Sequence, residues 1–349
     1  MVLAKEDRLR SLTGFSVSHV STAIFRMTPD VTIVIPCYKV GKYLAQTLQS
    51  VLTQTHRNLQ IIAVDDCSPD DTAQVIRQFE SKDSRLQGIF LSQNSGVSVA
   101  RNAGIDAALA PWIVFVDGDD WLPPNAIETL LSLQARTGAD FVCANARQYS
   151  DTGEAGAIHF RRQTGLVEFP IEDGLDAFWP HQEVFCTCTI KLFPLSAIRD
   201  HNIRFDAALR HAQDTLFTLT YVLRACPKIA IDYQAEVYCY RQNPASCVHA
   251  IPLEKRLHSL ELLITALDNL AVDCHQPRRL AAPKAAEYLW ALRKFSTSNA
   301  QRDELFQKLL SSPLFGEHIR PVLRQFGKFK HRMLLLLLDA GLTSALQFW

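Results

Sequence analysis

The sequence predicts an α/β fold, with a mainly parallel sheet covered by helices on both faces and an α-helical C-terminal region. Three observations support it. Short β-branched runs alternate with amphipathic helical patterns up to about residue 145. Acidic residues directly follow two of these runs, and beyond about residue 253 the pattern is helical only. We therefore expect an N-terminal extension over 1–30, an α/β domain over 31–250 and a helical region over 251–349.

Strands and helices alternate regularly in the first half of the α/β domain. The strands are expected over 31–35, 59–66, 86–91 and 112–116. The helices between and after them are expected over 42–55, 68–79, 96–109 and 123–136. Pro36 is expected to end the first strand, because proline lacks the backbone N–H. Ser68 or Asp70 is the expected cap of the second helix.

The second half of the domain is less regular. Residues 149–165 predict a polar loop or a hairpin, and residues 184–193 predict a strand pair or a sheet edge. An amphipathic helix is expected over 211–225, with Asp214 in its first turn. An aromatic-rich strand is expected over 235–242.

Composition excludes several classes of protein. Lys plus Arg and Asp plus Glu both number 36, so bulk charge gives no reason to expect a nucleic-acid partner. The N-terminus is charged and no apolar run reaches the roughly 18 residues that span a bilayer. The nine cysteines lack structural-zinc spacing, which favours a reduced, cytoplasmic protein.

The candidate functional residues are the acidic side chains at the ends of two strands. Asp65 and Asp66 end one strand, and Asp117, Asp119 and Asp120 follow another, at the sheet edge where α/β proteins bind ligands. Three close carboxylates need a cation to stay ionised, and oxygen ligands suit Mn²⁺ or Mg²⁺. The alternative is a solvated acidic turn. No P-loop and no GxGxxG motif follows the first strand.

These motifs resemble a family of enzymes. The stretches "VTIVIPCYKVGKYLAQTLQSVLTQTHRNLQIIAVDDCSPDDT", "NSGVSVARNAGIDAA" and "WIVFVDGDDWLPPNAIETL" resemble the family 2 glycosyltransferases of bacterial polysaccharide and lipooligosaccharide synthesis, which have the GT-A fold. The resemblance implies inverting, metal-dependent transfer from a nucleotide-diphosphate sugar, usually a UDP-sugar, to a hydroxyl of a glycan or lipid-linked acceptor. Residues 31–135 would form the nucleotide-sugar half and 136–250 the acceptor half.

The resemblance also assigns the nucleotide contacts. Pro36 and Tyr38 would line the nucleobase pocket, and Asp66 would meet the uracil edge with Asp65 beside it. Arg101 would lie near the ribose or the diphosphate.

A second set of assigned residues concerns the metal and the diphosphate. Asp117 and Asp119 form the DxD motif, and one of Asp119 and Asp120 would contact the ribose while the other binds Mn²⁺ or Mg²⁺. His249 would be a further metal ligand or diphosphate contact, with a loop histidine as the alternative. Arg241 and Ser246 could also touch the diphosphate.

Asp214 is the candidate catalytic base. The family's base is an Asp at a helix start, usually preceded by Glu, and here Gln213 takes the place of that Glu. A carboxylate in hydrogen-bonding reach of the acceptor hydroxyl can take its proton. The alternative is an acid that merely complements the helix dipole.

Two further questions stay open from sequence. Basic and apolar residues in the last thirty or so positions suit either an anionic membrane surface or a helix packed against the catalytic domain or a second subunit. The rival functions are a nucleotidyltransferase with a similar sheet and a non-catalytic sugar-nucleotide-binding protein. The donor sugar, the acceptor and the oligomeric state are not predicted.

Overall fold

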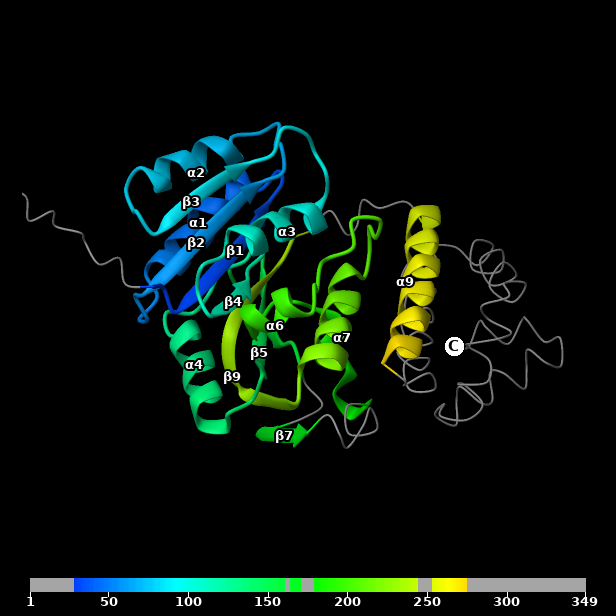
Figure 1. Cartoon of the computed structure of the whole chain (residues 1–349). Helices are drawn as coiled ribbons and strands as arrows, with labels where there is room; N and C mark the ends of the chain where they lie inside the picture. The colour runs from blue at the N-terminus through cyan, green and yellow to red at the C-terminus, as the bar shows by residue number, and fades with distance from the viewer. Residues whose placement is uncertain (1–27, 161–163, 171–178, 244–252, 275–349) are drawn as a thin grey trace, which may run out of the picture.

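A computed structural model describes residues 28–160, 164–170, 179–243 and 253–274 of the chain (Figure 1). The expected alternation is present in the first half of the chain. The elements are β1 (Val31–Cys37), α1 (Gly41–Leu52), β2 (Leu59–Asp65), α2 (Thr72–Glu80), β3 (Leu86–Phe90), α3 (Val97–Ala107), β4 (Trp112–Phe115) and α4 (Ala126–Thr137).

The second half contributes shorter strands and one long one. Its elements are β5 (Phe141–Ser150), β6 (Ala155–Ile158), β7 (Leu166–Pro170), the 3₁₀ helix η2 (Trp179–Cys186), β8 (Lys191–Pro194), α6 (Leu195–Asp200), α7 (Gln213–Ala225), β9 (Lys228–Gln242) and α9 (Leu253–Asp273). In Figure 1, α4 lies on one side of the central strands and α6 and α7 lie on the other.

The described strands form one sheet in the order β3-β2-β1-β4-β8-β5-β9-β7, with β6 paired to β5. β1 to β4 are parallel to one another, and β9 is parallel to β5. β8 runs antiparallel to both β4 and β5. The sheet is therefore mainly parallel as predicted, and its parallel strands end at one edge.

β1 does not end at Pro36 as the sequence suggested. Pro36 lies inside the strand and pairs with Val64 of β2. The neighbouring β4 pairs with β1 only as far as Val34. The chain keeps proline here because its missing N–H would point to the side on which β4 has already ended.

The predicted cap of the second helix is also corrected. Asp71 occupies the N-cap position of α2 without a side-chain capping bond. Asp70 instead accepts hydrogen bonds from the backbone N–H and the hydroxyl of Thr72, at 3.2 and 2.6 Å. Its other oxygen accepts from the Gly41 N–H at 3.2 Å, so this carboxylate joins the starts of α1 and α2.

Residues 184–193 form neither a strand pair nor an edge. Only β8 is a strand there, and it lies in the middle of the sheet between β4 and β5. The 149–165 segment does contain the expected hairpin, which joins β5 to β6. β9 is longer than predicted, with an irregularity in its pairing to β5 near Asn145.

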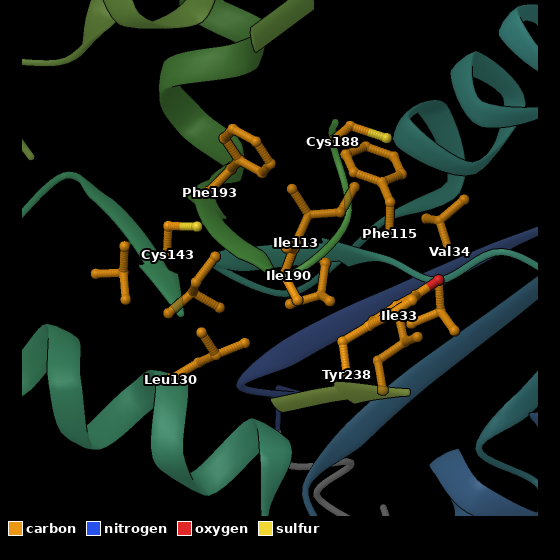
Figure 2. Packing of buried hydrophobic residues seen from close by; sticks show 14 of the residues in the cluster. Ile33, Val34, Ile113, Phe115, Leu130, Cys143, Cys188, Ile190, Phe193 and Tyr238 are labelled. Carbon is orange, nitrogen blue, oxygen red and sulfur yellow. The ribbon is translucent and has the colours of Figure 1, made fainter. Parts of the chain in front are cut away.

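The core lies where α3, α4 and α7 pack on the sheet, and Figure 2 shows part of it around Ile113, Phe115 and Phe193. Phe115 makes edge-to-face contacts with Phe193, Phe205 and Phe217 at 5.2 to 6.2 Å. These rings fix the end of β4, and the acidic residues follow directly from it.

No helix in the described part of the chain is long and apolar enough to cross a membrane. The basic C-terminal segment, and with it the question of a membrane surface, lies outside the described residues.

Candidate active site

The two acidic strand ends face one another around Cys37, the last residue of β1. Burial raises the pKa of the Cys37 thiol well above its usual value, and the negative charges of Asp65, Asp119 and Asp117 raise it further. Acidic residues after β2 and after β4 therefore act together on the electrostatic potential at the Cys37 thiol. The predicted convergence of the acids at the edge of the sheet is present.

The carboxylates at the end of β2 organise the backbone around them. Asp66 accepts hydrogen bonds from the backbone N–H groups of Ser95 and Gly96, both at 2.7 Å, directly before α3. Asp65 accepts from the Ser68 N–H at 3.2 Å. Both acids are buried. The half-buried Tyr38 directly follows Cys37, the last residue of β1, which pairs with Asp65.

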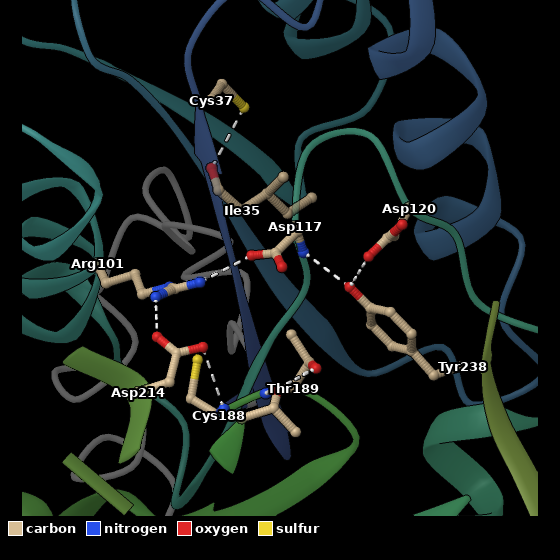
Figure 3. A network of polar contacts seen from close by, with 10 residues as sticks. Ile35, Cys37, Arg101, Asp117, Asp120, Cys188, Thr189, Asp214 and Tyr238 are labelled. Atoms are coloured by element: carbon tan, nitrogen blue, oxygen red, sulfur yellow. Dashed lines mark hydrogen bonds and ion pairs between the residues drawn. The ribbon is translucent and has the colours of Figure 1, made fainter. Parts of the chain in front are cut away.

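Asp117 and Asp214 share one arginine (Figure 3). Arg101 of α3 donates from Nη2 to Asp117 Oδ1 at 2.8 Å and from Nη1 to Asp214 Oδ1. The Arg101 side chain is 4% exposed, whereas Asp117 and Asp214 retain 33% and 18% exposure. The guanidinium is thus buried beneath two carboxylates that solvent reaches, and it joins the DxD motif to the candidate base.

Asp120 is held by the protein on both of its oxygens. Oδ2 accepts from the Tyr238 hydroxyl at 2.7 Å, and Oδ1 accepts from the Arg241 backbone N–H at 2.7 Å. The Tyr238 hydroxyl also accepts from the Asp117 backbone N–H at 3.1 Å. Asp120 is 2% exposed. This carboxylate is well placed to fix the loop and poorly placed to reach a ligand.

Asp119 is the freer member of the pair. Its side chain is half-buried, and Oδ2 accepts a long hydrogen bond from the Asn243 amide at 3.5 Å. Burial, and then the charge of Asp117, raise the pKa of Asp119 above its usual value. Arg241 offsets this shift only in part, and a bound cation would supply further positive charge.

The acids fit a divalent ion held jointly with a ligand. Within the described residues, no three His, Cys, Asp or Glu side chains are grouped as metal ligands. Mg²⁺ and Mn²⁺ sites for phosphate chemistry usually need only one or two protein carboxylates, with phosphate oxygens supplying the rest. Asp119 meets that requirement. The predicted ligand His249, like Ser246, lies outside the described residues.

Arg241 of β9 contacts the loop of residues 117–120, which carries the three acids after β4. Its Nε donates to the Asp119 carbonyl at 2.8 Å and its Nη2 to the Gln46 side chain at 2.6 Å. The guanidinium lies 4.7 Å from the ring centroids of both Tyr43 and Trp121. These contacts leave Arg241 little scope for the diphosphate contact that the sequence suggested.

Asp214 lies at the start of α7, where the sequence predicted it. The preceding Ala212 is left-handed, with φ 58°. The Asp214 Oδ2 atom accepts from the Cys188 backbone N–H at 3.4 Å, in the loop before β8. Left-handed backbone at a non-glycine residue is costly and is often found at functional sites.

Sequence reasoning missed Tyr238 as the partner of Asp120. It lies 118 positions away, and its only sequence signal is a tyrosine in an aromatic strand. Thr47 of α1 was also missed, although its buried hydroxyl donates to the Asp120 carbonyl at 2.6 Å.

Comparison with known proteins agrees with this geometry. The model of the family described as Glycosyl transferase family 2 matches residues 32–201. Glycosyltransferase GlyA of Streptococcus pneumoniae is 28% identical over 66% of this chain and 33% of its own length. The poly(ribitol-phosphate) beta-glucosyltransferase of Bacillus spizizenii is 27% identical over 72% of this chain and 38% of its own length. The match thus spans only 33% and 38% of the length of these two relatives.

Solved structures share the fold. S. aureus TarS 1–349 in complex with UDP-GlcNAc has a TM-score of 0.66 at 17% identity, covering 89% of this chain and 92% of that one. The mannosyltransferase PcManGT of Pyrobaculum calidifontis in complex with GDP-Man and Mn²⁺ has a TM-score of 0.51 at 14% identity, covering 91% and 81%. These likenesses confirm the expected glycosyltransferase architecture.

Proposed function

We propose that the chain, whose residues 32–201 match the model of Glycosyl transferase family 2, is a glycosyltransferase of that family. It would transfer a sugar from a UDP-sugar to a hydroxyl of a glycan or lipid-linked acceptor, with inversion, in cell-surface polysaccharide synthesis. The structurally similar TarS binds UDP-GlcNAc, and the poly(ribitol-phosphate) beta-glucosyltransferase is named for a polymer acceptor. Both support the donor class and the acceptor class proposed here. We place the reaction in the cytoplasm, where the C-terminal segment could meet the inner face of the membrane.

One observation carries the proposal. Asp117 and Asp214 are far apart in sequence yet bind the same guanidinium, that of the buried Arg101. A donor at the DxD motif and an acceptor hydroxyl at Asp214 would therefore lie within one side chain of each other. Inverting transfer needs this arrangement, because the base acts on the face of the sugar opposite the leaving group.

The donor half follows from the strand ends. Tyr38 and Pro36 would border the nucleobase, with Asp65 and Asp66 beside it. Asp66 already accepts two backbone N–H groups, so its role would combine shaping the loop before α3 with accepting from the base. Arg101 would act on Asp117 and Asp214 rather than on the diphosphate, since the guanidinium is buried between them.

Asp119 is our preferred metal ligand, and Asp120 our preferred loop-fixing residue. The choice rests on their contacts, because both oxygens of Asp120 accept protein hydrogen bonds whereas Asp119 keeps a half-buried, weakly partnered carboxylate. A Mn²⁺ or Mg²⁺ ion there would supply Lewis-acid stabilisation of the charge on the departing UDP. Asp117 would remain available to the ribose while its Oδ1 holds Arg101.

Asp214 would take the proton of the acceptor hydroxyl. Its 18% exposure lets a hydroxyl approach, while Arg101 and the Cys188 N–H fix the direction of the carboxylate. Gln213 in place of the usual Glu leaves a neutral side chain beside the base, so a second carboxylate does not compete for the proton.

A panel of UDP-sugars tests the proposal. The protein is incubated with each sugar and Mn²⁺ or Mg²⁺, and release of UDP is followed with and without EDTA. We expect release from one or a few donors, abolition by EDTA, and loss of at least tenfold in Asp119→Asn. A matched control is Asp83→Asn, which changes a surface carboxylate paired with Arg85 and should leave the rate unchanged.

Two results would contradict the proposal. Absence of UDP release from every donor, with the protein folded, would remove the assignment of a UDP-sugar. Release that EDTA and Asp119→Asn leave unchanged would remove the metal from the site.

A further inference from the structure

Lys191, the first residue of β8, has no exposed surface. β8 lies between β4 and β5, and Lys191 pairs across the sheet with Cys143. Its ammonium donates to the carbonyl of Thr189 at 3.0 Å. A buried ammonium is costly unless it is well satisfied, so its presence in the middle of a sheet requires an explanation.

The Lys191–Thr189 contact spans a strained residue. Ile190 between them has a φ of 59°, in the left-handed region that β-branched residues avoid. Its side chain is 3% exposed and belongs to the core. Such a conformation persists only where surrounding contacts determine it, and the bond from Lys191 Nζ back to Thr189 closes this turn.

The turn belongs to a short segment, residues 187–190, that reaches the candidate base. The Thr189 N–H donates to the Thr187 hydroxyl at 3.1 Å, and Thr218 of α7 donates to the Thr187 carbonyl at 3.3 Å. Thr189 also forms a bridge with Phe115 at the end of β4. Within this segment, the Cys188 N–H donates to Asp214 Oδ2 (Figure 3).

We propose that Lys191 is a positioning residue for the base: by binding the Thr189 carbonyl, it holds the left-handed turn that directs the Cys188 N–H at Asp214. The inference rests on the proposed function, because it assumes that Asp214 acts as the base. Lys191 touches neither donor nor acceptor in this account. It acts through the backbone of residues 187–190, and loss of its contact should misdirect the carboxylate while leaving the donor acids in place.

The charges around Lys191 are consistent with this role. The titratable groups that face it are Cys143 of β5, Cys186 and Cys188 before β8, and Asp214 of α7, with His159 after β6 within electrostatic range. Burial lowers the pKa of Lys191, and the thiols and Asp214 oppose that shift. The ammonium therefore also adds a positive charge within electrostatic range of Asp214.

Lys191→Met tests the proposal, because methionine keeps the length of the side chain and removes the charge and the donor. The change also removes the desolvation cost of burying the ammonium, which offsets the loss of its bond to Thr189. We expect an unchanged or raised Tm, a KM for the UDP-sugar within about twofold of wild type, and a kcat lower by about tenfold or more. Lys228→Met is the matched control, since Lys228 pairs with Glu168 on β7 and should affect Tm alone.

A second variant acts on the segment from the other side. Thr218→Val removes the hydroxyl that binds the Thr187 carbonyl and should also lower kcat without raising the donor KM. If Lys191→Met does not fold, Thr218→Val tests whether the 187–190 segment positions the base. A kcat within about twofold of wild type in the folded variants would overturn the proposal, as would a loss confined to KM.

The two levels of the account fail in different ways. If no donor gives UDP release, the proposed function fails. If Asp214→Asn keeps full UDP release, the assignment of the base is wrong, and the positioning role of Lys191 fails with it. If Asp214→Asn is inactive while Lys191→Met retains wild-type kcat, the base stands and only the positioning role of Lys191 is lost.

Discussion

Tyr238→Phe removes one oxygen atom and should loosen the acidic loop. That oxygen donates to Asp120 Oδ2 at 2.7 Å and accepts from the Asp117 N–H at 3.1 Å. Burial and the Asp120 charge hold the pKa of Tyr238 far above its usual value, so the hydroxyl stays a donor at every working pH. The side chain is 2% exposed, so water does not readily replace the lost contacts.

The magnitude follows from the two bonds. A hydrogen bond to a buried charged group contributes about 1.5–3 kcal/mol, and an unsatisfied backbone N–H costs about 1 kcal/mol more where solvent partly reaches it. We expect a loss of about 3 kcal/mol, or about 6–12 °C in Tm for a domain of this size. The donor should also bind less tightly, because Asp119 is the neighbour of the loosened Asp120.

Tyr221→Phe is the matched control for this prediction. Tyr221 is fully buried, and its hydroxyl donates to the neutral carbonyl of Asp140 at 2.8 Å. Loss of that bond should cost about 1 kcal/mol and leave donor affinity unchanged. Thermal unfolding of both variants, with and without UDP and Mn²⁺, makes the comparison. Equal losses of Tm in the two variants would refute the role assigned to the charge of Asp120.

Three further predictions concern the same site and its support. Arg101→Met should cost about 3–5 kcal/mol, because it leaves two carboxylates without their shared cation, and adding Asp214→Asn should recover part of that loss in thermal melts. A purely additive double variant would contradict the ion-pair bridge. Burial raises the pKa of Asp119, so the folded protein binds more protons than the unfolded chain in the acid range. In metal-free buffer, wild type should therefore lose stability relative to Asp119→Asn as pH rises through that range. A stability difference that grows in favour of wild type would contradict this prediction. Gly104→Ala should lower Tm by several degrees, because a Cβ there would lie 2.2 Å from Val34 Cγ1 where α3 packs on β1; an unchanged Tm would mean that α3 can move away at little cost.

The parallel half of the fold was predictable because its signals are local. β-branched runs, helical periodicity and acids at the strand ends all lie within a few residues of the elements they specify. The exceptions were Pro36, which stays inside β1 because β4 ends early, and the cap of α2. Both depend on neighbouring elements that the local pattern does not contain.

The support of the site was not predictable, since it comes from elements far along the chain. Tyr238 and Arg241 reach Asp120 from β9, and the pattern of that strand indicates only an aromatic strand. Residues 184–193 were expected to form a strand pair or a sheet edge, but β8 inserts between β4 and β5 and buries Lys191 completely. A lysine within an apolar run is typical of an edge strand, and only the tertiary contacts show that this strand is internal.

The most direct test of the central claim is the turnover of Asp214→Asn at saturating UDP-sugar and Mn²⁺, measured alongside donor affinity on the same protein. If Arg101 joins a donor site at Asp117 to a base at Asp214, the variant should bind the donor with wild-type affinity and turn it over about 10²–10⁴-fold more slowly. Wild-type turnover in this variant, or a loss explained entirely by weaker donor binding, would contradict the account.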